Sequence, residues 1–314
     1  MTAREQVLRF LLSAQRPLSG QDMAARIGCS RMAVCKAISD LREEGFEIWS
    51  RTRAGYQLTG IPDRLHADLL RAGLQREHTV YLLEQVDSTN NYLRDHPDLP
   101  DGTVVVARTQ TGGRGRRGKS FSSPADKGVY FSFSIQRSIP AEQMWAVTFM
   151  AAVAVTGTLQ QAGADARIKW VNDVYVGGKK ICGILTEVTM DAESRESSRI
   201  LVGIGVNLKK GGLPPELADV ATTLEDQGVT LSGCDAITGI VNRFDQMLST
   251  FDISAILESY RRDCFVPGCR VRFERDGIRY VGVATSVLDN GNLAVECDGE
   301  QMTLSSGEIF VLEK

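Results

Sequence analysis

The sequence predicts an α+β protein of several domains: an N-terminal winged helix-turn-helix, a central α/β domain and a small C-terminal β-barrel. Three observations carry this prediction. Helical periodicity and a basic hairpin occupy residues 1–60, β-branched runs alternate with a long apolar helix in the middle, and short alternating strands follow residue 268. A chain of 314 residues is long enough for two or three domains.

The first 60 residues have the pattern of a helix-turn-helix. Two short helices are separated by Pro17–Gly20, the second breaks at Gly28, and Ser30 is placed to cap a third helix. A hairpin with a basic tip then reads as a wing. The polar face of the third helix and the wing tip are expected to meet the DNA major groove. The residues expected there are Ser30, Arg31, Lys36, Arg51 and Arg53.

The charge of this segment permits two interpretations. Residues 1–65 carry ten Lys and Arg against seven Asp and Glu, an excess too small for a monomer to bind duplex DNA tightly. A dimer would present two recognition helices to a palindromic site. The alternative is a winged helix that mediates protein contacts alone.

The centre of the chain is organised around a glycine-rich basic loop. It lies between the predicted strands 103–107 and 129–135, and glycines 112, 113, 115 and 118 alternate there with Arg114, Arg116, Arg117 and Lys119. Glycine lets a backbone approach a ligand closely, and neighbouring cations repel unless an anion lies among them. The loop is therefore expected to fold over a phosphate or carboxylate; a solvated basic hairpin tip is the alternative.

The same loop matches a phosphate-binding motif. Gly113–Ser120 fits the P-loop pattern G-x-x-x-x-G-K-S, which must lead directly into a helix. Here Phe-Ser-Ser-Pro and a strand follow, so the P-loop is the weaker interpretation.

Two polar corners are further candidates for ligand binding. Asp87–Asn91 follows the predicted strand 80–86 and either caps the next helix or forms a pocket wall. Lys169, Asn172, Asp173 and Lys180 surround a predicted hairpin, and an amide and a carboxylate beside two lysines suit a magnesium–phosphate group. Glycines 203 and 205, on one face of the predicted strand 199–207, indicate close approach by a ligand or backbone. The longest predicted helix spans 142–162.

The C-terminal region, 268–314, has five short alternating runs separated by Asp-Gly, Asp-Asn-Gly and Asp-Gly-Glu turns. This pattern is typical of a small β-barrel.

Composition narrows the setting. The net charge of −3 favours neither a nucleic-acid coat nor a membrane surface, and no apolar run approaches the ~20 residues that span a bilayer. The seven cysteines form no C-x-x-C pair, and the N-terminus has no apolar signal-peptide core. We expect a cytoplasmic protein with reduced thiols and no membrane partner.

Five motifs occur in a fixed order and together carry a resemblance. They are Val86-Asp-Ser-Thr-Asn90, Gln110-Thr-Gly-Gly-Arg-Gly-Arg-Arg-Gly118, Lys169-Trp-Val-Asn-Asp173, Lys180-Ile-Cys-Gly-Ile-Leu185 and Gly203-Ile-Gly-Val-Asn207. This set resembles the bacterial biotin–protein ligases, and with the winged helix it is similar to their bifunctional form, the biotin operon repressor. The resemblance implies a winged helix at 1–62, a central ligase domain of the class II aminoacyl-tRNA synthetase type at 63–266, and a Src-homology-3-like barrel at 267–314.

The resemblance also implies an activity. Such enzymes join biotin and ATP into biotinyl-5′-adenylate and transfer biotin to a lysine of the carrier protein of acetyl-CoA carboxylase. By resemblance Lys180 and Arg116 are catalytic. Biotin would be bound by Ser88, Thr89, Asn90, Gln110, Arg114, Gly115, Arg116 and Lys180. ATP or the adenylate would be bound by Arg116, Phe121, Lys169, Asn172, Lys180 and Asn207, and Mg²⁺ by Asn172 and Asp173. A homodimer with adenylate bound would then bind operator DNA.

Two departures from the family pattern concern Val171, where the family usually has proline, and Lys119-Ser120-Phe121, where it often has a second basic residue and tryptophan. Two other classes compete with this interpretation. A lipoate-type ligase would share the central fold but would lack the DNA-binding domain. A ligand-sensing repressor without catalysis would have little use for so many cations beside a phosphate site.

Overall fold

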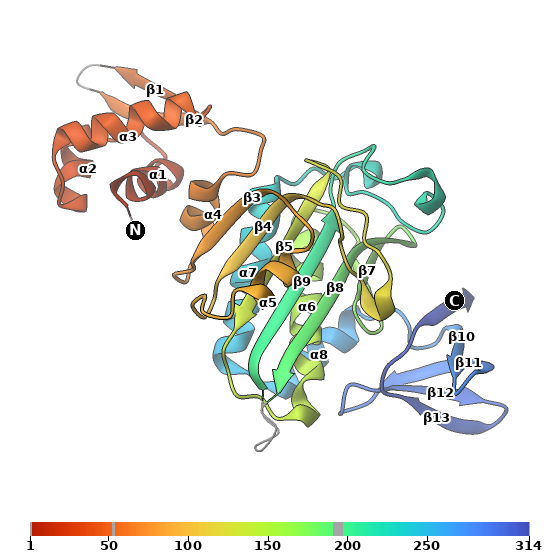
Figure 1. The fold of residues 1–314 in the computed structure, drawn as a ribbon. Coiled ribbons are helices and arrows are strands. Elements are labelled where there is room, and N and C mark those ends of the chain that lie inside the picture. The colour runs from red at the N-terminus through yellow and green to blue at the C-terminus, as the bar shows by residue number, and fades with distance from the viewer. Residues whose placement is uncertain (1, 52–53, 191–196, 314) are drawn as a thin grey trace.

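The computed structural model describes residues 2–51, 54–190 and 197–313. Its elements form three groups along the chain: an N-terminal helical group with a two-stranded hairpin, a central seven-stranded sheet with helices, and a C-terminal five-stranded sheet (Figure 1). Among the described residues, no helix is both long enough and apolar enough to cross a membrane.

The N-terminal group confirms the predicted helix-turn-helix and wing. Ser30 caps the third helix by accepting a hydrogen bond from the Ala33 N–H at 3.1 Å, and Gly28 ends the second helix at φ 75°, a conformation that glycine adopts without strain. The elements are α1 (Ala3–Ser13), α2 (Gly20–Ile27), α3 (Arg31–Glu43), β1 (Glu47–Arg51) and β2 (Gly55–Gly60).

The central sheet has the strand order β3-β4-β5-β9-β8-β7-β6, with β3 and β4 parallel and the other neighbours antiparallel. The strands predicted from β-branched runs are all present. They are β3 (Val80–Val86), β4 (Val104–Gln110), β5 (Gly128–Ile135), β6 (Arg167–Lys169), β7 (Asp173–Val176), β8 (Lys179–Met190) and β9 (Ser197–Asn207).

Helices cover one face of this sheet and leave room on the other (Figure 1). The first face packs against α6 (Trp145–Gln161), α7 (Gly233–Thr250) and α8 (Ile253–Asp263), while α4 (Ala67–Gly73) packs against α7. Neither α7 nor α8 is among the predicted elements. The prediction that 142–162 holds the longest helix is wrong by a small margin, because α7 has 18 residues and α6 has 17.

The second face is covered in part by α5 (Thr89–Asp95), which packs Leu93 against Val105 and Leu201. Successive side chains of a strand alternate between faces, so β4 contributes apolar side chains to the clusters on both faces of the sheet. Beyond the start of α5, this face carries glycines and small polar residues, and the loop 111–121 lies over it. The second face therefore holds the candidate site.

The C-terminal group is an antiparallel sheet of order β13-β12-β11-β10-β14. The Asp-Gly pairs at 276–277 and 298–299 have positive φ at both residues and join neighbouring strands in two-residue turns, as predicted. The strands are β10 (Arg270–Arg275), β11 (Ile278–Val287), β12 (Leu293–Cys297), β13 (Glu300–Leu304) and β14 (Ile309–Glu313).

Candidate active site

A hollow that is partly open to solvent lies on the second face of the central sheet. The residues that line it come from the start of α5, the loop 111–121, β5, the β6–β7 corner, β8, β9 and the C-terminal sheet. They include every predicted central-domain site residue except Asn207: Ser88, Thr89, Asn90, Gln110, Arg114, Gly115, Arg116, Phe121, Lys169, Asn172, Asp173 and Lys180.

A chain of hydrogen bonds forms the polar end of the hollow. The Thr89 N–H donates to Gln110 Oε1 at 2.9 Å, and the hydroxyls of Thr89 and Ser132 lie 2.6 Å apart. The Ser132 hydroxyl donates in turn to Asn90 Oδ1 at 2.6 Å. Thr89, Asn90 and Ser132 are buried and Gln110 is half-buried, so the hydrogen bonds hold these side chains in place before a ligand arrives. Ser88 stands at the N-cap of α5 but makes no side-chain capping bond, which leaves its hydroxyl for the hollow.

Glycines on β9 create the space in the hollow. A Cβ added to Gly203 would lie 2.4 Å from Asn90 Oδ1, and one added to Gly205 would lie 2.4 Å from the Phe121 ring. Any side chain at these positions would push the amide or the ring away. The groups that approach the two glycines are the side chains of Asn90 and Phe121, and not backbone. Approach by a ligand stays a prediction.

The β6–β7 corner and the start of β8 bring opposite charges together. Lys180 Nζ lies 2.7 Å from Asp173 Oδ1, and Arg116 Nη1 donates to Asn172 Oδ1 at 3.3 Å. Asn172 is held in turn, because its Nδ2 donates to the Ile184 carbonyl at 2.6 Å. The predicted convergence of Lys169, Asn172, Asp173 and Lys180 is confirmed.

Burial lowers the pKa of two cationic side chains in this site. Desolvation lowers the pKa of Arg116, with the neighbouring Arg117 acting in the same direction and Asp173 opposing. Desolvation also lowers the pKa of Lys169, although Asp173 and Glu308 favour its charged form. An anionic ligand would raise both pKa values again, because its charge would replace the solvation that burial has removed.

The loop 111–121 is a narrow turn. The Gly115 N–H donates to the Lys119 carbonyl at 2.6 Å, and the Phe121 N–H donates to the Gly113 carbonyl at 2.9 Å. The next regular element is the strand β5 and not a helix, so the P-loop interpretation is wrong. The solvated-tip interpretation holds in part, because Arg114, Arg117 and Lys119 are exposed whereas Arg116 is half-buried, and all four line the hollow.

The C-terminal sheet closes one side of the hollow through Gly307, Glu308 and Ile309. Lys119 Nζ lies 2.6 Å from Glu308 Oε1, which joins the basic loop to the start of β14. The sequence prediction missed this wall and also Ser132. One signal could have identified Ser132, because it is a serine within a buried alternating strand and lies opposite the polar start of a helix. No local pattern marks Glu308.

Asn207 lies elsewhere. It is 8% exposed at the end of β9, outside the hollow, and its Nδ2 donates to the Thr222 carbonyl at 3.2 Å. The structure accordingly gives Asn207 a role in holding the segment after β9.

A second candidate surface lies on the winged helix. Arg31, Lys36 and Arg51 are exposed, as is Ser30, while Arg53 lies outside the described residues. Arg42, on the same helix, is committed to the wing, because its guanidinium donates to the Ile48 carbonyl at 2.6 Å. The exposed cations at the start of α3 thus remain available to a phosphate backbone.

Comparisons with known proteins match two parts of this chain, the central domain and the winged helix. Residues 82–207 match the Biotin/lipoate A/B protein ligase family, and residues 3–57 match an HTH domain. The chain is 33% identical over 93% of its length to the bifunctional ligase/repressor BirA of Bacillus subtilis, of which it covers 93%. It is 26% identical to the Escherichia coli protein of the same name, over 93% of this chain and 92% of that one.

One solved structure reproduces the central and C-terminal arrangement. The biotin protein ligase from Aquifex aeolicus in complex with biotin and ATP has a TM-score of 0.65 and 26% identity to this chain, over 75% of this chain and 99% of its own. The fold around the hollow is therefore one that is found in a ligase structure with both small molecules.

Proposed function

This chain belongs to the family of bifunctional biotin–protein ligases and repressors. From that premise we propose which residues bind each substrate and which take part in the reaction. The protein joins biotin and ATP into biotinyl-5′-AMP and transfers biotin to a lysine of the biotin carboxyl carrier protein of acetyl-CoA carboxylase. One observation carries the proposal: six cationic and two anionic described side chains line a hollow with a fixed polar end.

The polar end suits the head group of biotin. Thr89, Asn90 and Gln110 offer hydroxyl and amide groups that hydrogen bonds hold in place, and Ser88 adds a hydroxyl. Such groups recognise a ureido ring at low ordering cost. Arg114, Gly115 and Arg116 would close over the ligand from the loop. Arg116 and Lys180 contact Asn172 and Asp173 at the β6–β7 corner, where the carboxylate of biotin would lead.

The cationic end suits the reaction between two anions. A biotin carboxylate oxygen attacks the α-phosphorus of ATP, the new P–O bond forms, and the bond to the pyrophosphate oxygen breaks. Lys180 and Arg116 lie beside Asp173 and Asn172, where they would offset the combined negative charge. Phe121 and Lys169 would contact the nucleotide. In the second step the amine of the acceptor lysine attacks the mixed anhydride and AMP leaves.

Mg²⁺ fits the donor set in this corner. Asp173 supplies a carboxylate and Asn172 an amide oxygen, and magnesium is commonly held by one or two such groups together with substrate phosphates. When bound, it supplies charge neutralisation at the phosphates. Asp173 is paired with Lys180, so a bound ion and the lysine would share this carboxylate.

The winged helix would bind operator DNA when biotinyl-5′-AMP fills the hollow and the protein is a homodimer. Two recognition helices double the phosphate contacts and set the half-site spacing. Ligand would favour this dimer if ordering of residues 112–121 completes a surface beside the site. We further propose domain limits at 1–62, 63–266 and 267–314, with the last forming a Src-homology-3-like barrel. All seven cysteines are free, which suits the reducing cytoplasm.

The test is incubation of the protein with biotin, α-labelled ATP and a biotin carrier domain. Labelled adenylate and a biotinylated carrier lysine are expected. Adenylate from lipoate but not biotin would point to a lipoate-type ligase, and binding without adenylate formation would point to a sensor. Sedimentation and operator binding are then measured with and without biotinyl-5′-AMP. A chain that stays monomeric with adenylate, or binds operator equally well without it, contradicts the repressor mechanism.

A further inference from the structure

The short helix α4 bridges the winged helix and the central sheet. On one side, Asn242 of α7 donates from Nδ2 to the Gly73 carbonyl at 2.9 Å and accepts the Gln75 N–H at 2.8 Å. On the other side, Arg9 of α1 donates from Nη2 to the Arg71 and Leu74 carbonyls at 2.8 and 2.9 Å. The two parts therefore share α4 as a common support.

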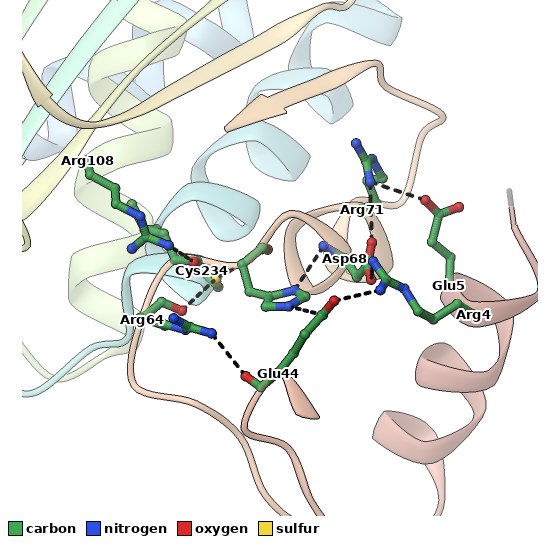
Figure 2. Close-up of polar contacts among 10 residues, drawn as sticks. Arg4, Glu5, Glu44, Arg64, Asp68, Arg71, Arg108 and Cys234 are labelled. Carbon is green, nitrogen blue, oxygen red and sulfur yellow. Dashed lines mark hydrogen bonds and ion pairs between the residues drawn. The ribbon is translucent and has the colours of Figure 1, made fainter. Parts of the chain in front are cut away.

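A buried carboxylate lies at the centre of this bridge (Figure 2). Asp68 is 1% exposed, and Arg4 of α1 places Nη2 2.6 Å from its Oδ2. Arg71 places Nη1 3.3 Å from Asp68 Oδ1 and 3.4 Å from Glu5 Oε1. A carboxylate without water around it needs such cations, so Asp68 holds the winged-helix side chain Arg4 against α4.

Glu44, at the end of α3, extends the network. It accepts from Arg4 Nη1 at 2.7 Å, and its other oxygen lies 2.6 Å from His66 Nε2 (Figure 2). The ligand atoms of Glu44, His66 and Asp68 all lie within 4.8 Å of one another, a spacing that a metal ion also requires. Arg4 and Arg71 supply positive charge to these carboxylates, where a metal ion would otherwise be needed.

The connecting segment alone would not hold the two parts together. Residues 61, 63 and 64 are exposed, and this stretch has no regular secondary structure. Arg64 adds one hydrogen bond from Nη2 to the Glu44 carbonyl at 3.2 Å. Without the network, the hydrogen bonds from Arg9 and Arg64 and the packing of α1 against α4 would remain, and the winged helix would be held less firmly.

We propose that the Arg4–Asp68–Arg71 network locks the winged helix to the ligase domain, and that operator binding depends on this lock whereas biotin transfer does not. The inference rests on the proposed function, because a dimer must hold two recognition helices at a fixed half-site spacing. A free winged helix would lose that spacing and would have to be ordered again at each binding event.

The test is the variant Arg4→Glu in the full-length protein. This variant replaces the cation beside Asp68 and Glu44 with a third carboxylate. Calorimetry and small-angle scattering report on the lock without any ligand. One unfolding transition is expected for the parent chain. The variant is expected to show two transitions and a larger radius of gyration. Operator binding is expected to weaken at least tenfold, with adenylate formation at the parent rate.

Two further variants separate the lock from general damage. In Arg4→Glu/Glu44→Arg the new arginine returns a cation to Asp68 from the winged-helix side, and the single transition is expected to recover. Arg76→Glu makes the same charge change at the Arg76–Asp101 pair, whose side chains are 51% and 37% exposed, and should leave the single transition intact. Arg4→Ala serves as the milder change if Arg4→Glu fails to fold.

The lock is overturned if Arg4→Glu, or Arg4→Ala in its place, melts in one transition at the parent radius of gyration. It is also overturned if the double variant stays as loose as Arg4→Glu. If the parent protein neither biotinylates a carrier nor binds operator, the proposed function fails, while calorimetry and scattering still decide the lock.

Discussion

Two regions of this protein are rich in arginine, but they differ in how many carboxylates surround the cations. In the interdomain network, Arg4 and Arg71 contact Glu5, Glu44 and Asp68, so their charge is neutralised within the protein. In the hollow, six cations share two carboxylates, those of Asp173 and Glu308. The first region is complete in itself, whereas the second has a positive charge that an anionic ligand completes.

The difference teaches that a cluster of arginines signals binding where carboxylates are scarce. A balanced cluster contributes to stability and orientation, since each charge already has its partner. A cluster with excess positive charge is unfavourable until an anion binds. A loop that carries such a cluster therefore responds to the ligand. The predictions below remove charges from one region or the other.

The largest effect is expected for Lys180→Ala in the unbalanced region. Adenylate formation should fall by about 10²–10³-fold, because the variant removes a cation where carboxylate and phosphate meet. Biotin binding should change far less. Single-turnover adenylate assays and biotin titration measure the two quantities. Lys179→Ala is the matched control, since Lys179 Nζ donates to the Ala218 carbonyl at 2.6 Å, outside the hollow. Adenylate formation at the parent rate in Lys180→Ala would refute the assignment.

In the balanced region, Asp68→Ala should lower the free energy of unfolding by about 3 kcal/mol, because it leaves two arginines without their shared carboxylate. Urea denaturation followed by circular dichroism measures this change. Asp289→Ala, which removes an exposed partner of Arg261, should cost less than about 1 kcal/mol. Equal losses in the two variants would mean that burial of Asp68 contributes nothing.

A smaller effect is expected for Arg116→Gly. Biotinyl-5′-AMP should escape about tenfold faster, because the loop loses a side chain that spans the hollow to Asn172. Bystander lysines should then become biotinylated without a carrier domain. Release of labelled adenylate by rapid filtration checks the rate, with the exposed neighbour Arg117 changed to Gly for comparison. Release at the parent rate would count against a retaining role for Arg116.

The smallest effect concerns a paired cation whose charge depends on pH. Burial by itself lowers the pKa of His78, but hydrogen bonds to Asp245 at 2.7 Å and to the Gly102 carbonyl at 2.6 Å outweigh it, so the pKa is raised above 6.5. The stability from this pair is present below the unfolded pKa of about 6.5 and is lost as pH rises through the folded value.

His78→Gln should therefore destabilise the protein most at acidic pH, by about 1 kcal/mol, and less as pH rises. Urea midpoints of parent and variant from pH 5.5 to 9 measure the difference. His96→Gln is the control, because His96 is exposed and its imidazole contacts Tyr92 alone among the described residues, through a hydrogen bond to the Tyr92 carbonyl and stacking on the Tyr92 ring. A difference that grows with pH would contradict the sign.

The sequence by itself determined the local elements and most of the site. Asp-Gly pairs require turns with positive φ, β-branched runs require buried strands, and Ser30 requires a helix start; each of these holds over a few residues. Site residues within the five motifs were predictable because the motifs preserve residue type and order. All of those predicted in the central domain line the hollow except Asn207.

Only the tertiary structure decided which distant groups meet. Glu308 reaches Lys119 across 189 positions, Ser132 meets Asn90 across 42, and Asp68 meets Arg4 across the linker. No local pattern encodes these pairs, because they depend on how sheets and helices pack. The balance of charge around an arginine, which separates the lock from the ligand site, is likewise a property of the packed chain.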